Sequence, residues 1–264
     1  MRARAAAAGA AAGMIIGCAG CSSAHAHPQA SQVRATVTTM PTSPALPDRA
    51  LPSPGCSTAT AKAPSLRGAG TAMVSVPGNP FGVTLTRDGR YLLAASGNGA
   101  VVVSVARAEQ GRAETDPAAS VVATVAAGCN PVRVITSAGG REVWVTARGS
   151  DDLLCFSAAA LQSHPARALV AIVRVGEAPV GLMLVRNGAL IVVADSNRFA
   201  APGATSDLSV VNVAAALAGQ PAEVGYVPAG MFPREMALEP GGQYLLVSNY
   251  ASNQLEAVSI PSIP

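Results

Sequence analysis

Nine polar residues in the C-terminal part of the chain stand in short segments that follow or precede runs of apolar residues. They carry amide, carboxylate and guanidinium groups, which recognise ligands through hydrogen bonds and charge. Asn and Asp also form turns with their own backbone, so each one taken alone has a structural explanation. As a group on one face they predict a binding surface. The candidate residues are Asn98, Arg148, Asp152, Glu177, Asp195, Asn197, Arg198, Asn249 and Asn253.

The same segments offer little for catalysis. Hydrolysis needs a general base or a metal-activated water, and His164 is the only histidine after residue 70. It precedes Pro165, in a connection that we expect at the opposite edge of the fold. No serine occupies a nucleophile-elbow motif, and no zinc-ligand spacing occurs. Asp195, Asp207 and Glu177 carry oxygen ligands for a hard cation, but their spacing does not require one. We therefore predict no catalytic residue, no metal and no cofactor.

The N-terminus is typical of an export signal. Residues 1–4 carry two arginines, and residues 5–16 form an uninterrupted apolar and small-residue run that is too short to span a bilayer. The motif Ile15-Ile16-Gly17-Cys18 resembles the lipobox of bacterial lipoproteins, in which the cysteine thiol receives a diacylglycerol and cleavage occurs just before it. This resemblance implies a signal peptide over 1–17 and a lipid on Cys18. The alternative is an ordinary secretory signal that contains a cysteine by chance.

Residues 18–70 are rich in Pro, Ala, Ser and Thr and have few periodic apolar residues. Such a segment cannot bury enough apolar surface to fold, so we predict a disordered tether between lipid and domain. The formal net charge is +3, and the signal peptide accounts for two of the arginines. A nearly neutral mature chain without a basic cluster argues against nucleic-acid binding. The predicted partners are a membrane, through the lipid, and an unknown protein or small-molecule ligand at the cell envelope.

Four repeats within residues 71–264 position the candidate residues. Each repeat opens with an apolar residue, a glycine and, after one to three further residues, a proline. A short apolar strand, a tight turn with Asp-Gly, Asn-Gly or Gly-Gly, and a second strand follow, which is the pattern of a hairpin. The prolines are Pro80, Pro131, Pro179 and Pro233, and the turns lie at 87–90, 137–140, 186–189 and 239–242.

Further apolar segments predict a third strand in every repeat and a fourth strand in the first three. Four antiparallel strands repeated at about 50 residues make the blade of a β-propeller. The third strands are expected at 100–105, 153–157, 208–213 and 255–260, and the fourth at 120–125, 169–175 and 223–227.

The last repeat stops after its third strand, whereas residues 71–76 form a lone strand of fourth-strand character. We therefore predict an all-β fold, a small β-propeller of about four four-stranded antiparallel blades, closed by this N-terminal strand because free edges are a liability. The alternative is an open arc, paired with another copy as a homodimer. The predicted blades are about 77–127, 128–175, 176–229 and 230–264, the last completed by 71–76.

The fourth repeat carries the clearest motif. Its Pro240-Gly241-Gly242 and Tyr244-Leu245-Leu246-Val247-Ser248-Asn249 resemble the repeat of the YVTN family of β-propellers. The first repeat has Asp88-Gly89 and Tyr91 but ends in Ala94-Ala95-Ser96. The resemblance covers residues 71–264 and implies a propeller related to lactonase-like propellers. It implies little about function, since this propeller type hosts many roles.

We favour a non-catalytic binding or scaffold module that presents one loop face to its ligand or protein partner. The alternatives are a lactonase-like hydrolase, of the 6-phosphogluconolactonase type, and a periplasmic metal- or redox-linked accessory protein, both suggested by fold kinship alone. Export permits disulfides. Cys129 could bond to Cys155 or to Cys56, and either pairing leaves one of the three unpaired within the chain.

Overall fold

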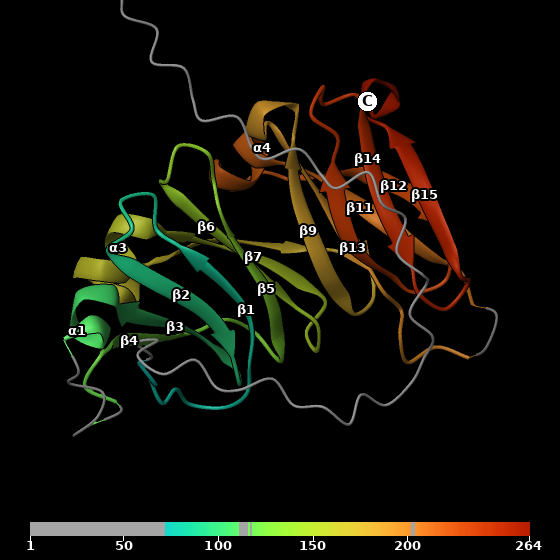
Figure 1. Ribbon diagram of the computed structural model, residues 1–264. Coiled ribbons are helices and arrows are strands. Elements are labelled where there is room, and N and C mark those ends of the chain that lie inside the picture. The colour runs from blue at the N-terminus through green and yellow to red at the C-terminus, as the bar shows by residue number, and fades with distance from the viewer. Residues whose placement is uncertain (1–71, 111–115, 117, 202–203) are drawn as a thin grey trace, which may run out of the picture. The chain divides into compact units, whose positions relative to one another are not determined.

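The computed structural model describes residues 72–110, 116, 118–201 and 204–264, all within one unit, Ser65–Pro264. The predicted signal peptide, Cys18, the tether and Cys56 lie outside the described residues. Fifteen strands of the described part form four antiparallel sheets, each with its strands in chain order (Figure 1). The expected all-β fold, a small propeller with one antiparallel sheet for each sequence repeat, is confirmed.

Three sheets have four strands and the last has three. The first blade contains β1 (Pro80–Leu85), β2 (Tyr91–Ser96), β3 (Gly99–Ser104) and β4 (Val121–Ala126). The second contains β5 (Pro131–Thr136), β6 (Glu142–Ala147), β7 (Asp152–Ser157) and β8 (Leu169–Arg174). The third contains β9 (Pro179–Val185), β10 (Leu190–Asp195), β11 (Ser206–Asn212) and β12 (Glu223–Ala229). The fourth contains β13 (Pro233–Leu238), β14 (Tyr244–Asn249) and β15 (Gln254–Ser259).

The turns between first and second strands form as the sequence predicts. In the first blade Gly89 has a φ of 68° and donates its N–H to the carbonyl of Thr86 at 2.9 Å. In the second blade Gly140 has a φ of 71° and donates to Ser137 at 2.8 Å. Positive φ strains a residue with a Cβ, so glycine at these positions closes the hairpin and fixes its register.

Apolar side chains fill the space between neighbouring blades. Leu93 and Val102 of the first blade pack with Val143 and Phe156 of the second, and comparable clusters join the second blade to the third and the third to the fourth. The innermost strands β1, β5, β9 and β13 contact one another in succession. Because a blade between two others buries both faces of its sheet, its central strands are continuous apolar runs rather than alternating ones.

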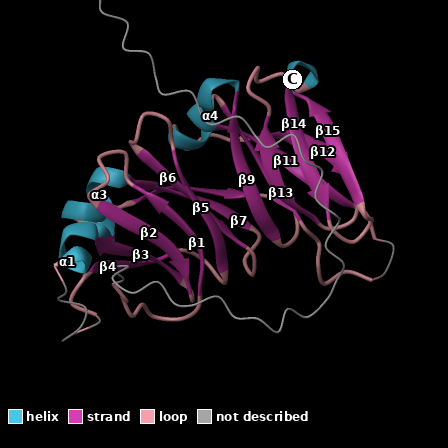
Figure 2. Cartoon of the chain, in the orientation of Figure 1, coloured by secondary structure: helices cyan, strands magenta, loops and turns pink. Residues whose placement is uncertain are grey.

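Short helices follow the third strands of the first three blades: α1 (Val105–Glu109), α3 (Ala158–Ser163) and α4 (Val213–Leu217), drawn in cyan in Figure 2. The side chains of Ser104, Ser157 and Asn212 cap them by accepting a backbone N–H from the first turn. Single-turn 3-10 helices lie at Pro165–Arg167, Arg186–Gly188 and Ile260–Ser262. These helices were not expected from the sequence, although the cap residues recur at equivalent positions.

The structure corrects the predicted closure of the ring. Residues 72–76 belong to no sheet within the described residues, and β15 has a strand partner only on the side of β14. Val74 and Val76 instead pack against the first blade's own buried cluster of Ala94, Val101 and Val103. Within the described residues, no contact comparable to that between β1 and β5 joins β1 to β13. The four blades of the described part therefore form an open arc (Figure 1).

Candidate binding site on the loop face

Two sets of loops lie together at one edge of the sheets. The second hairpin loops join the second to the third strand of a blade (97–98, 148–151, 196–205 and 250–253), and the linking loops precede each first strand (77–79, 127–130, 175–178 and 230–232). In the last three blades, the first two residues of the second hairpin loop donate N–H groups to carbonyls of the linking loop. These bonds are Arg148 to Asn130, Gly149 to Cys129, Ser196 to Ala178, Asn197 to Glu177, Tyr250 to Phe232 and Ala251 to Met231, all 2.8–3.2 Å. The two sets therefore form one surface, the loop face.

Two arginines of the loop face converge on one aromatic ring. The guanidinium carbon of Arg148, from the second blade, lies 5.7 Å from the centroid of the Phe199 ring. That of Arg198, from the third blade, lies 5.2 Å from the same centroid. Both distances allow the attraction between a cation and the negative face of a ring. Phe199 is 70% exposed, so this meeting point is open to solvent.

Further aromatic rings extend the site to the first and fourth blades. Phe81 lies 5.9 Å from the guanidinium of Arg148, and Phe232 lies 5.5 Å from that of Arg198. Phe232 also packs edge-to-face against Tyr250, with 5.5 Å between centroids. The arginine–aromatic cluster is thus drawn from all four blades. Its members are Phe81, Arg148, Arg198, Phe199, Phe232 and Tyr250.

Neither of the two arginines forms an ion pair with a carboxylate of the described part of the chain. Four ion pairs occur among the described residues, and neither Arg148 nor Arg198 takes part in one. Burial, and secondly the positive charge of Arg198, lower the pKa of Arg148. The Nε atom of Arg148 is buried and has no hydrogen-bond partner among the described residues. Two like charges held close together, with donors unused, favour an anion between them.

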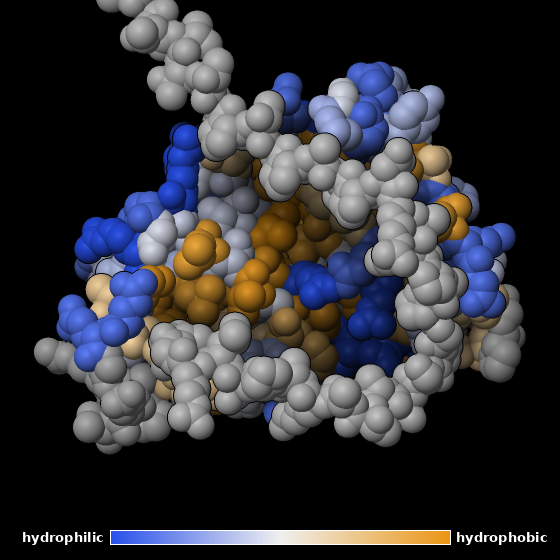
Figure 3. Space-filling view, viewed as in Figure 1, coloured by the Kyte–Doolittle hydropathy of each residue, from blue (hydrophilic) through white to orange (hydrophobic). Residues whose placement is uncertain are grey.

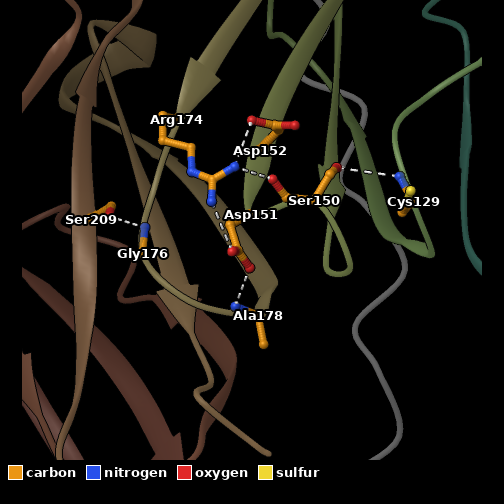
Figure 4. A network of polar contacts seen from close by, with 8 residues as sticks. All are labelled: Cys129, Ser150, Asp151, Asp152, Arg174, Gly176, Ala178 and Ser209. Atoms are coloured by element: carbon orange, nitrogen blue, oxygen red, sulfur yellow. Dashed lines mark hydrogen bonds and ion pairs between the residues drawn. The ribbon is translucent and has the colours of Figure 1, made fainter.

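Asp152, a predicted site residue, belongs to a structural network instead. Its Oδ1 lies 3.8 Å from Nη1 of Arg174, whose Nη2 lies 3.0 Å from Oδ2 of Asp151 (Figure 4). Asp151 also accepts the N–H of Ala178 through Oδ1 at 2.8 Å, which ties the second blade to the linking loop of the third. These groups are engaged with one another, so we assign them to holding the loops in place.

Three of the predicted asparagines also stabilise the loops. Asn98 accepts the N–H of Asn130 through Oδ1 at 3.4 Å. Asn197 donates from Nδ2 to the carbonyl of Thr205 at 3.0 Å across the longest second hairpin loop. Asn253 has a φ of 56° in the turn before β15. The turn-forming role that the sequence allowed for these residues is the one their contacts support.

Asp195 and Asn249 occupy equivalent positions at the ends of β10 and β14, and both are buried. A Cβ on Gly176 would lie 2.6 Å from Cγ of Asp195, and one on Gly230 would lie 2.6 Å from Nδ2 of Asn249. The linking-loop glycine before the first strand of each of these two blades therefore makes room for a polar side chain at the end of the second strand of the same blade. Burial first, and the charge of Asp207 among the other causes, raise the pKa of Asp195 to about 8.

Two further residues considered in the sequence are exposed and lie apart from the arginine–aromatic cluster. Glu177 is exposed in the linking loop before β9. His164 is exposed at the C-terminal end of α3, away from the loop face.

Cys129 and Cys155 are not bonded to each other, so that predicted alternative is wrong, and Cys56 lies outside the described residues. No three His, Cys, Asp or Glu side chains of the described part gather closely enough to hold a metal ion. No helix of that part is long and apolar enough to cross a membrane.

Arg148 and Arg198 were predicted as site residues from the sequence, but the aromatic rings around them were not. The chain has only four Phe, four Tyr and one Trp. Three of the four Phe lie in this cluster, in or beside loops, where core packing does not require them. Scarce aromatic residues gathered at the loops of successive repeats were the available signal for a binding surface.

No family model and no curated protein matches the chain. Solved structures do match it. One is hydrazine synthase of Kuenenia stuttgartiensis (18% identity, TM-score 0.55, 75% of this chain and 50% of that one). Another is a candidate 6-phosphogluconolactonase of Bacteroides fragilis (18% identity, TM-score 0.53, 68% of this chain and 50% of that one). A third is the β-propeller domain of Cps50 (Swd1) from Myceliophteria thermophila (12% identity, TM-score 0.51, 69% of this chain and 53% of that one). These likenesses show the fold, and the chain spans about half the length of each structure.

Proposed function

We propose that this protein is a non-catalytic binding module of the cell envelope, and that its loop face holds an anionic ligand between Arg148 and Arg198. One observation carries the proposal: two arginines from different blades lie over the exposed ring of Phe199, and neither has a carboxylate partner among the described residues. The lipid anchor expected at Cys18 would hold the module at a membrane.

The chemistry of the cluster indicates the class of ligand. Guanidinium groups bind carboxylate and phosphate oxygens through two parallel N–H bonds. The rings of Phe81, Phe199, Phe232 and Tyr250 offer flat apolar surface beside these donors. A small molecule with a carboxylate or phosphate on an aromatic or otherwise planar body satisfies both parts.

A lactone hydrolase is the second candidate, suggested by the likeness to the Bacteroides fragilis protein. A phosphorylated lactone would give the arginines their anion. The carboxyl group nearest this role in the third blade, Asp195, is only 1% exposed and hydrogen-bonded to Ser209, so it has no access to a substrate on the loop face. We therefore favour binding without catalysis.

The test is calorimetric titration of the full chain in mild detergent with phenyl phosphate, with benzyl alcohol as the neutral probe. We expect phenyl phosphate to bind and benzyl alcohol not to bind measurably. The double variant Arg148→Gln/Arg198→Gln should bind phenyl phosphate about tenfold more weakly or worse, because a hydrogen bond to a charged group contributes about 1.5–3 kcal/mol.

Arg107→Gln is the matched control, since Arg107 lies on α1 at the other edge of the first blade. It should bind like the unaltered protein. Equal affinity of the double variant and the control would overturn the proposed site. Release of acid from a phosphorylated lactone by the purified protein, lost in the double variant, would replace the binding role by the hydrolase.

A further inference from the structure

Among the described residues, the fourth blade has one strand fewer than the other three, and residues 72–76 belong to no sheet. The fourth blade ends at β15, whereas β3, β7 and β11 each pair with a further strand. Residues 72–76 directly precede the linking loop of β1, just as β4, β8 and β12 precede the linking loops of β5, β9 and β13. Residues 72–76 therefore occupy the place of a fourth strand that belongs to a blade before the first.

The side chains of residues 72–76 follow the same pattern as the true fourth strands. Val74 and Val76 stand six and four residues before Pro80. At the same two positions before the equivalent prolines stand Val125 and Ala127, Val173 and Val175, and Val227 and Ala229. Every pair packs into the cluster shared with the blade that follows. Met73 and Ser75, which alternate with the two valines, are exposed, as in a strand with one buried face.

The fourth blade leaves apolar surface uncovered on the side away from the third. Leu255 is 88% exposed, Tyr244 is 51% exposed and Leu246 is 48% exposed. In the first three blades the corresponding face is covered by the next blade. Apolar side chains also lie open on the hollowed face over β1 and β5 (Figure 3), where Phe81, Val83 and Leu85 of β1 are exposed. Both ends of the arc thus have the character of unfinished blade interfaces.

We propose that two copies of this chain close into one ring, in which residues 72–76 of each copy form the fourth strand of the other copy's last blade. Val74 and Val76 of each copy continue to pack on the first blade of their own copy. In the ring, this first blade covers the exposed Tyr244, Leu246 and Leu255 on the fourth blade of the other copy. A second copy fits better than self-closure because, within the described residues, no contact comparable to that between β1 and β5 joins β1 to β13.

The solved structures support this choice of occupant. The propeller domain from Myceliophteria thermophila is covered to 53% by this chain, so two copies supply about as much matching chain as that one propeller domain contains. A two-fold pair joined through both ends gives the free edge of β15 a strand partner in each copy and has closed symmetry, and both features are favourable. This inference does not depend on the anionic ligand.

The register of the new strand pair follows from the other blades. Ala126 pairs with Gly99, Arg174 with Asp152 and Pro228 with Asp207. Each first-named residue stands five positions before the proline of the next blade, and each partner pairs with the last residue of its second strand. The same rule places Ser75 of one copy opposite Gln254 of the other, since Gln254 pairs with Asn249.

Cross-linking tests this register. The full chain in mild detergent, carrying Ser75→Cys and Gln254→Cys, should form covalent dimers under mild oxidation, since paired residues have Cβ atoms about 4.5–5.5 Å apart. Peptide mapping should join the two introduced cysteines. Ser75→Cys with Ala257→Cys, three positions along, is the matched control and should cross-link far less. A covalent monomer with the two introduced cysteines joined would show self-closure and overturn the proposal.

Sedimentation provides a second, independent measurement. The unaltered full chain should sediment as a dimer in detergent, and Leu255→Glu should shift it to monomer. The variant should still fold, because Leu255 is exposed in a single copy and does not belong to its core. Ile172→Glu on β8 is the control, since Ile172 is also an exposed apolar residue but β8 already has its place in a blade. A monomer at all concentrations, or a dimer equally insensitive to both substitutions, would exclude the two-copy ring.

Discussion

Asp195 and Asp207 pair directly across β10 and β11, so two carboxyl groups share one face of the third blade at the base of loop 196–205. Oδ2 of Asp195 accepts the N–H of Ser209 at 2.9 Å, while Oδ1 has no partner among the described residues. A proton on Asp195 removes the repulsion between the two groups and the cost of burying a charge. The pair thus makes the stability of the third blade depend on pH.

We expect the free energy of unfolding to fall as pH rises from about 4 to about 8. Burial raises the pKa of Asp195 from 3.8 to about 8, so over this window the folded protein holds a proton that the unfolded chain has lost. Stability from this group is fully present below the unfolded pKa and lost as pH approaches the folded one, with a limiting slope of about 1.4 kcal/mol per pH unit. Urea denaturation at pH 5 and pH 8 measures the difference.

Asp195→Asn should flatten this dependence and stabilise the protein at pH 8, because the amide is neutral at both pH values. Asn249 already occupies the equivalent position in the fourth blade, so the shape is tolerated there. Glu109→Gln, on the exposed surface of α1, serves as control and should keep the slope. An unchanged slope in Asp195→Asn would show that another group carries it.

Binding of an anion between Arg148 and Arg198 should weaken as salt is added, because counter-ions screen partly exposed charges. Titrations at low and high ionic strength measure this effect. Salt-independent binding would be incompatible with a site built on these guanidinium groups.

Phe199→Leu should weaken the binding of phenyl phosphate about threefold to tenfold, since it removes a ring–cation contact of about 0.5–1 kcal/mol and a stacking surface. Titration of this variant and of the unaltered protein at the same ionic strength measures the difference.

Much of the fold could be predicted from local sequence. The hairpins are encoded by residues a few positions apart, as at Asp88-Gly89, and the continuous run Val101-Val102-Val103 reflects a strand buried on both faces. The helices α1, α3 and α4 were missed because they are short, and their cap residues, such as Ser104, also suit a loop. Closure depends on the angle between blades, which is set by packing between residues far apart in the chain, such as Phe156 against Val102.

The candidate site was predictable only in part. Arg148 and Arg198 were named because they stand in second hairpin loops. Their meeting over Phe199 depends on how two blades are placed, and Asp152 looked equally available although Arg174 engages it. A loop position predicts on which edge a side chain lies. It does not predict whether a neighbour already satisfies its charge.

The lipid on Cys18 stays a prediction. Mass analysis of the mature N-terminus should find a diacylglyceryl cysteine, and Cys18→Ala should release the protein from the membrane fraction or leave it unprocessed. Cys21→Ala is the control, because Cys21 lacks an aliphatic residue three positions upstream and should be dispensable for anchoring. An unmodified mature N-terminus downstream of Cys18 would exclude the anchor.

The glycine of the linking loop before β9 is expected to be coupled to the side chain at the end of β10, the second strand of the same blade. Gly176→Ala places a Cβ 2.6 Å from Cγ of Asp195 and should cost about 1–3 kcal/mol, the usual cost of overpacking a buried site. Adding Asp195→Ala removes the contacts of the new Cβ with Cγ and Oδ2 and leaves the one with Cβ of residue 195, at 2.8 Å, so the double variant should lose less than the sum of the two single losses. Gly139→Ala is the control, because the nearest neighbour of its new Cβ within 4 Å would be Nε of Arg141 at 3.8 Å.

Urea denaturation of the unaltered protein, the two single variants and the double variant measures the coupling. At pH 5, where Asp195 is protonated, the measurement separates this steric coupling from the effect of charge. Strict additivity would mean that the glycine is required by the backbone rather than by Asp195.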